Sequence, residues 1–183
     1  CYGMATVEGP LLSLKNVNAY SHYTDWTVAH VHVGALGFNG FMIFAMLYYL
    51  VPRMWNTTLH SRKLANTHFL ISTIGILLYA IPMYWAGWAQ SLMWKKFTDG
   101  GQLQYQFLET VTHIVPMYVM RGVGGLLYWA GAFLAVYNLA KTMKKGSFQD
   151  NEEAEGLPLS AQAMPTGKLH WHTAIERKPI QLL

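Results

Sequence analysis

Residues 26–52 read WTVAHVHVGALGFNGFMIFAMLYYLVP, a run of 27 residues with no charged side chain. Two similar runs follow at residues 67–94 and 110–140, and the only charged residue in either is Arg121. Of the 183 residues, 52% are hydrophobic and 12% are charged, whereas about 25% are charged in ordinary soluble domains. A helix needs about 20 mostly apolar residues to cross a bilayer core of ~30 Å. The sequence therefore predicts an all-α membrane protein with three transmembrane helices, at about 26–52, 67–94 and 113–140.

The charged residues gather beside the ends of these runs. Basic side chains follow the first and third runs: Arg53, Arg62, Lys63, Lys141, Lys144 and Lys145. Because cytoplasmic loops are enriched in Lys and Arg, residues 53–66 and the chain after Ala140 are predicted to be cytoplasmic. Residues 14–25 and 95–112 then lie on the outer side. Membrane topology accounts for the net charge of +4, so we expect lipid and no nucleic acid as a partner.

The composition of the chain changes near residue 145. Residues 1–145 hold the three spans, whereas residues 146–183 are polar, with acidic side chains followed by prolines, and indicate a cytoplasmic linker. Residues 1–13 are expected to end an earlier span near Gly9-Pro10. The chain opens at Cys1 without an initiator Met or a signal-peptide pattern, so we expect a fragment of a longer protein. A single cysteine excludes an internal disulfide and a metal centre built from cysteines.

Two histidines, His30 and His32, lie inside the first uncharged run. Ionisable side chains within a span are costly and indicate function. Residues i and i+2 of a helix point about 200° apart, so the two rings cannot share one metal ion but can hold two separate cofactors. Gly34 and Gly37 follow on the face of His30 and are expected to admit a flat macrocycle such as haem, whose iron accepts an axial imidazole. Alternatively, both histidines bond to neighbouring helices and the glycines serve helix packing.

Four segments of the sequence resemble the catalytic subunit of cbb3-type cytochrome c oxidases. They are Gly3–Pro10, Ser21–His32, Asn66–Phe69 and Arg121–Gly125, and the resemblance extends over roughly residues 1–143. It implies that the chain supplies the final three helices of a twelve-helix haem-copper oxidase subunit in the bacterial inner membrane. It also implies c-type cytochrome subunits as partners.

The resemblance further implies a role for each histidine of the pair. His30 would bind the iron of the high-spin haem b3 and His32 that of the low-spin haem b, while the copper ligands lie in earlier helices. The implied enzyme is a proton-translocating cytochrome c oxidase that reduces O2 to water. The alternatives are a nitric oxide reductase of the same superfamily, a non-catalytic membrane b-type cytochrome, and, if the purified protein is colourless, a transporter.

Three further residues are candidates for the surroundings of the haems. His22 and Asp25 lie near the expected haem edge on the outer side, where they can bond with propionates or their waters; a solvated loop is the alternative. Arg121 is a cation inside a span and needs a partner. We expect it to pair with a haem propionate, and the alternatives are snorkelling to the interface or bonding to a helix carbonyl.

The remaining histidines support weaker expectations. His68 and His113 are expected to be water-facing interfacial residues, and His60, His170 and His172 ordinary surface residues. Residues Leu169–Pro179 resemble the cytoplasmic start of the mono-haem c subunit of the same oxidases. This resemblance implies that the two subunits are fused through the acidic linker, and an ordinary tail is the alternative.

Overall fold

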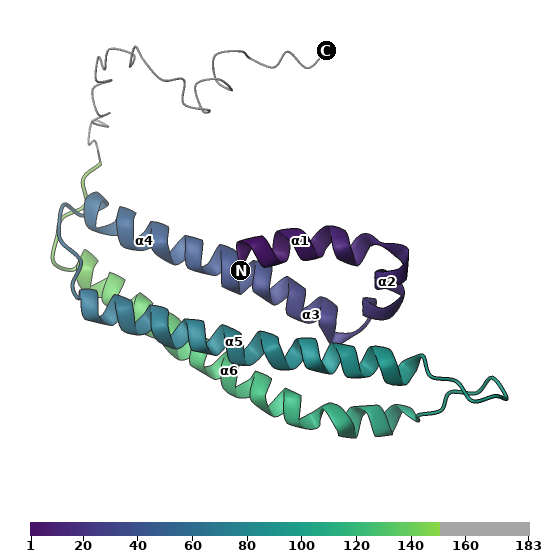
Figure 1. The fold of residues 1–183 in the computed structure, drawn as a ribbon. Helices are drawn as coiled ribbons and strands as arrows, with labels where there is room; N and C mark the ends of the chain where they lie inside the picture. Colours follow the sequence, from purple (N-terminus) through teal and green to yellow (C-terminus); the bar gives the residue numbers. More distant parts are fainter. Residues whose placement is uncertain (151–183) are drawn as a thin grey trace, which may run out of the picture. The chain divides into compact units, whose positions relative to one another are not determined.

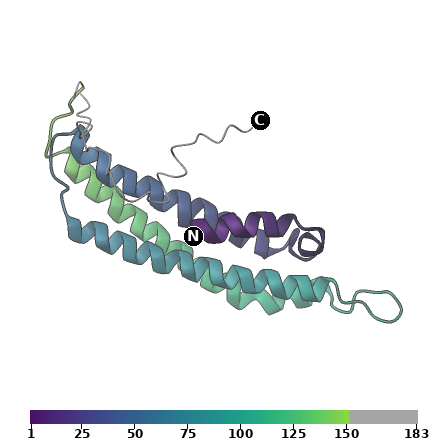
Figure 2. The same cartoon turned by 45° about the horizontal axis from the view of Figure 1, so that its top comes forward.

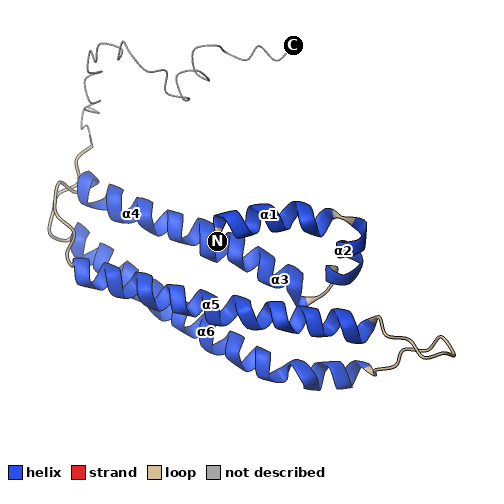
Figure 3. Ribbon diagram, in the orientation of Figure 1, coloured by secondary structure: helices blue, strands red, loops and turns tan. Residues whose placement is uncertain are grey.

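The computed structural model describes residues 1–150, and every regular element among them is a helix (Figure 3). The helices are α1 (Tyr2–Ser13), α2 (Lys15–Ser21), α3 (Asp25–His32), the π-helix η1 (Val33–Gly40), α4 (Phe41–Met54), α5 (Arg62–Trp94) and α6 (Phe107–Met143). Three stretches are long and apolar enough to cross a membrane: Asp25–Met54, Arg62–Trp94 and Phe107–Met143. The predicted all-α fold with three spans is thus confirmed. Most of the predicted linker, the segment resembling the mono-haem c subunit, His170 and His172 lie outside the described residues.

Helices α5 and α6, which form the second and third spans, begin earlier than predicted because polar side chains cap their first turns. The Ser61 side chain accepts a hydrogen bond from the backbone nitrogen of Leu64 at 3.2 Å. At the start of α6, Gln106 and Glu109 form a capping box. Caps satisfy the free backbone N–H groups at the beginning of a helix, so the helix can extend beyond the apolar stretch.

The helix formed by the first residues does not end at Gly9-Pro10. It lies beside the first span. α1 continues through Pro10 to Ser13, and α2 then reverses the chain so that α1 lies along α3 and η1 (Figure 1). The predicted stop is wrong: the missing hydrogen bond and the ring of Pro10 disturb one turn, and α1 continues for three more residues. The Ser13 hydroxyl also donates to the carbonyl of Gly9 at 3.1 Å.

The π-helix η1 joins α3 to α4 within one continuous span. In a π-helix the hydrogen bonds run from residue i to i+5, which disturbs the α-helical pattern at that point. The hydroxyl of Tyr128 in α6 donates to the Leu36 carbonyl at 3.0 Å. This contact ties the irregular turn to the third span.

α5 and α6 pack against each other along their lengths (Figures 1 and 2). Their backbones approach closely at two glycines. A methyl group on Gly75 would lie 2.6 Å from the backbone nitrogen of Tyr128, and one on Gly124 would lie 2.6 Å from that of Tyr79. Small residues permit such close packing of helices in membranes.

The loops gather at the two ends of the bundle. At one end the Ser91 hydroxyl donates to the Tyr20 carbonyl. At the other, the backbone nitrogens of His60 and Gln149 donate to the Thr142 hydroxyl and the Met54 carbonyl, at 3.0 and 2.9 Å. The loops before α3 and after α5 therefore share one end, and those after α4 and α6 share the other, as predicted. Which end is cytoplasmic remains a prediction.

Candidate functional site

The two histidines lie in the last turn of α3 and face different helices. Thr24 caps α3 by accepting a hydrogen bond from the backbone nitrogen of Trp26 at 3.3 Å. The helix then continues regularly to His32. The His30 ring contacts Glu8 of α1, whereas the His32 ring contacts Tyr79 of α5. The rings thus point to opposite sides, as the i, i+2 spacing predicts.

Glu8 anchors His30 and is itself held by two other side chains. Its Oε2 lies 3.1 Å from His30 Nδ1 and accepts a hydrogen bond from the Tyr84 hydroxyl at 2.6 Å. Its Oε1 accepts from Trp26 Nε1 at 2.6 Å. Hydrogen bonds from three donors replace those that this nearly buried carboxylate would otherwise make with water. With its Nδ1 proton directed at Glu8, His30 keeps the Nε2 lone pair for a metal ion.

His32 is oriented by a backbone group. Its Nδ1 lies 2.8 Å from the Val28 carbonyl, so the Nδ1 proton is donated there and Nε2 becomes the acceptor. Nε2 lies 3.1 Å from the Tyr79 hydroxyl, and the two rings stack with centroids 4.6 Å apart. An iron ion can therefore bind Nε2 only when the Tyr79 hydroxyl moves aside.

This donor set fits axial ligation of two separate haem irons. Each histidine has its Nδ1 engaged by the fold, and its Nε2 lies on its own face of α3, where that of His32 is bonded to the Tyr79 hydroxyl. A partner on the second nitrogen fixes the tautomer and the ring orientation of a metal ligand. Residues 1–150 contain no cluster of three or more His, Cys, Asp or Glu side chains able to hold a metal ion. The two histidines thus fit haem ligation.

Arg121 lies on the His32 side of the site. Its guanidinium is 5.0 Å from the centroid of the Tyr118 ring and 5.9 Å from that of Tyr79, and its Nη1 is 3.6 Å from the sulfur of Met83. Among residues 1–150 it has no carboxylate partner. Tyr79 therefore neighbours both this cation and His32.

Asp25 and His22 occupy different environments. Asp25 is buried, and its Oδ2 accepts hydrogen bonds from Gln90 Nε2 and the Tyr118 hydroxyl, both at 2.7 Å. Its backbone nitrogen donates to Gln90 Oε1 at 2.6 Å. Asp25 is therefore not part of a solvated loop. His22 is exposed, with its ring against that of Tyr23 at 4.0 Å between centroids.

The face of Gly34 and Gly37 is covered by α1, contrary to the expected room for a macrocycle. A methyl group on Gly34 would lie 3.8 Å from Ala5, and one on Gly37 would lie 2.8 Å from the sulfur of Cys1. The two glycines admit a neighbouring helix, which is the packing alternative. The expectation was wrong because the returning path of α1 depends on contacts far along the chain.

Among the other histidines, His68 is not water-facing. It is 1% exposed, its Nδ1 lies 3.1 Å from the Tyr48 hydroxyl, and its ring meets Phe44 edge-on. The prediction failed because α4 packs over this turn of α5. His113 is exposed, as expected, whereas His60 is half-buried.

Glu8, Tyr79, Tyr84 and Trp26 were missed by sequence reasoning about the site. One signal was available: Glu8 is the only charged residue in the first fourteen. The tyrosines and the tryptophan resemble ordinary interfacial aromatics, so their pattern gave no indication of these contacts.

Residues 1–127 match the family of cytochrome c and quinol oxidase polypeptide I. The chain is 52% identical over 145 residues to cytochrome c oxidase subunit 1 of Rhodobacter capsulatus, covering 79% of this chain and 27% of that protein. It is 45% identical over 144 residues to the cbb3-type cytochrome c oxidase subunit CcoN1 of Stutzerimonas stutzeri, covering 78% and 30%. A nitric oxide reductase subunit of Stutzerimonas stutzeri is 22% identical over 138 residues, covering 73% and 29%. The chain spans about a quarter of the length of the oxidase subunits.

Proposed function

Because the chain belongs to the family of cytochrome c and quinol oxidase polypeptide I, we propose that it supplies the last three membrane helices of the catalytic subunit of a cbb3-type cytochrome c oxidase. The enzyme would take electrons from cytochrome c, reduce O2 to water and translocate protons across the bacterial inner membrane. Identities of 45% and 52% to oxidase subunits support this proposal over a nitric oxide reductase, at 22%. In the complex, c-type cytochrome subunits would be its partners.

His30 would hold the high-spin haem b3 through Nε2, and His32 would hold the low-spin haem b through Nε2. When bound, haem supplies electron transfer and binding of O2. The proposal rests on one observation. The Nδ1 atom of each histidine is hydrogen-bonded within the protein, and the two rings lie on opposite faces of one short helix. Copper, the other metal of these oxidases, would be held by residues of the subunit outside this chain.

The two histidines differ in what orients them. His30 donates to the carboxylate of Glu8, whereas His32 donates to the neutral carbonyl of Val28. A carboxylate acceptor makes an imidazole a stronger electron donor than a carbonyl does. The chain would thereby give the iron on His30 the more electron-rich ligand and favour its oxidised state.

Arg121 would pair with a propionate of the haem on His32, since its guanidinium and that histidine both border Tyr79. Tyr118 connects this cation to Asp25, because its hydroxyl donates to the Asp25 carboxylate while its ring lies beside Arg121. Asp25 would thus position Arg121 through Tyr118. His22, exposed on the preceding turn, would bond with water at the same edge of the haem. Beyond residue 145, the chain would continue as a cytoplasmic linker toward a mono-haem c subunit.

The test is to replace each histidine in the full-length oxidase complex. His30→Ala should remove or disturb the high-spin haem that binds CO and leave the low-spin spectrum largely intact, and His32→Ala should do the reverse. His113→Ala, on the exposed side of α6, is the matched control and should leave both spectra unchanged. The ligand assignment fails if either α3 variant assembles with both haem spectra unaltered. Rapid O2 consumption with cytochrome c, compared with NO reduction by the same preparation, tests the oxidase assignment separately.

A further inference from the structure

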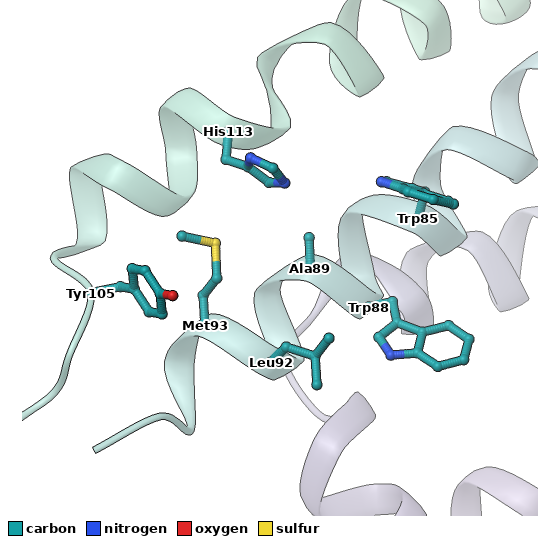
Figure 4. A pocket seen from close by; sticks show the side chains of 7 residues that line it. All are labelled: Trp85, Trp88, Ala89, Leu92, Met93, Tyr105 and His113. Carbon is teal, nitrogen blue, oxygen red and sulfur yellow. The ribbon is translucent and has the colours of Figure 1, made fainter. Parts of the chain in front are cut away.

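An apolar groove lies between α5 and α6 at the end of the bundle where the loop 95–106 joins them. It has a volume of about 630 Å³ and is lined by Trp85, Trp88, Ala89, Leu92, Met93, Tyr105 and His113. Figure 4 shows the side chains of Trp85, Ala89, Met93 and His113 turned toward one hollow. The Trp85 and Trp88 side chains are 66% and 62% exposed in this chain, so the groove opens outward from the helix pair.

The groove continues into a second hollow that is cationic. This hollow has a volume of about 420 Å³ and shares Leu92, Met93 and Tyr105 with the first, and it is also lined by Tyr20, Ser91, Lys95 and Lys96. Both lysines are exposed and have no carboxylate partner among residues 1–150. Their Nζ atoms lie over the rings of Tyr20 and Tyr105, at 5.1 and 5.7 Å from the centroids. An apolar slot therefore ends at two positive charges.

We propose that this surface binds an anionic phospholipid, with one acyl chain in the apolar groove and the phosphate at Lys95 and Lys96. Tryptophan and tyrosine rings prefer the level of lipid headgroups, and this groove lies at the end of two spans, where that level is expected. The charge distribution also orients the lipid. Glu109 lines a third hollow that also includes His113, so an anionic headgroup is repelled from that hollow and attracted to the lysines. This inference does not depend on the haem assignment.

The experiment uses the full-length oxidase complex, washed in detergent and then titrated with phosphatidylglycerol while bound lipid is counted by mass spectrometry. Ala89→Phe should fill the apolar groove, and the double variant Lys95→Gln/Lys96→Gln should remove the charges. Losing two exposed ion pairs to the phosphate should weaken binding about two- to 30-fold. The control is Lys144→Gln/Lys145→Gln, an equal loss of charge at the opposite end of α6.

The proposal holds if both groove variants lose the tightly bound phosphatidylglycerol while the control keeps it and all retain their haem spectra. If the lysine variant binds phosphatidylglycerol as the wild type does, an anionic lipid at this site is refuted, whatever the result for Ala89→Phe. Such a result would fit a groove covered by another helix. Equal losses in the control would likewise overturn it, because the effect would then be one of general surface charge. If Ala89→Phe does not assemble, the lysine variant decides alone.

Discussion

At the scale of single residues, Glu8 makes the environments of the two histidines unequal. Glu8→Gln keeps a hydrogen-bond acceptor for His30 Nδ1 but removes the negative charge. The imidazole then donates less electron density to iron, so the midpoint potential of the haem that binds CO should rise by tens of mV. A redox titration followed by optical spectroscopy measures this potential. Tyr84→Phe removes one donor to Glu8 and leaves more of its negative charge for His30, so it should shift this potential the opposite way. The haem proposed for His32 serves as the internal control, and a similar shift in both haems would contradict the argument.

Arg121 should act on the other haem. Arg121→Leu removes a positive charge beside the space that His32 and Tyr79 border. Positive charge favours reduced iron, so the midpoint potential of the low-spin haem should fall, and Arg121→Lys should retain part of the wild-type value. Potentiometric titration of the assembled variants gives the comparison. Identical potentials in wild type and Arg121→Leu would exclude the pairing with a propionate.

Residue patterns point to the two histidines as candidate ligands but not to the groups that orient them. His30 and His32 were identifiable because an imidazole pair is costly within an uncharged span and its spacing fixes the relative directions of the rings. Glu8 in α1 lies 22 positions from His30, and Tyr84 in α5, which donates to Glu8, lies 76 positions from Glu8. No local pattern encodes such contacts, because they depend on how α1 folds back.

At the scale of elements, the contact between α5 and α6 depends on Gly75 and Gly124. Gly124→Ala would place a methyl group 2.6 Å from the backbone of α5, so the helices must separate, at a cost of about 1–3 kcal/mol. Tyr79 is the residue displaced, and the low-spin haem should be lost at a lower temperature. Gly122→Ala is the control, since nothing lies within 4 Å of a methyl group there. Thermal denaturation followed by the haem spectrum distinguishes them, and equal midpoints would contradict the packing argument.

The existence of the spans was predictable, but their ends and their neighbours were less so. The long apolar runs require helices, whereas the first turns of α5 and α6 depend on the caps at Ser61 and Gln106, outside the apolar stretches. The burial of His68 depends on the side chains of Phe44 and Tyr48 in α4, which hydropathy alone does not encode.

At the scale of the whole molecule, the two groups of loops should lie on opposite sides of the membrane. In a Cys1→Ser background, Gly100→Cys should react with an impermeant thiol reagent in intact cells, and Thr58→Cys only after the membrane is opened. The reason is the excess of basic residues near the loop after α4. Thr58 is preferred to Ser61 because it is exposed and does not cap α5. If only Thr58→Cys were labelled in intact cells, the predicted assignment of the two sides would have to be reversed.

The π-helical turn has a consequence for how the first span tolerates changes in length. Removing one residue from Val33–Gly40 would let the chain adopt ordinary α-helical bonding without breaking the span. His30 and His32 precede the turn and would keep their partners on α1 and α5. Phe41–Met54 would keep nearly the same face toward its neighbours, because a π-helical turn holds about one residue more than the α-helical turn that would replace it. The span therefore consists of two segments. Insertions and deletions in the second segment leave the position of the first, which holds the histidines, unchanged.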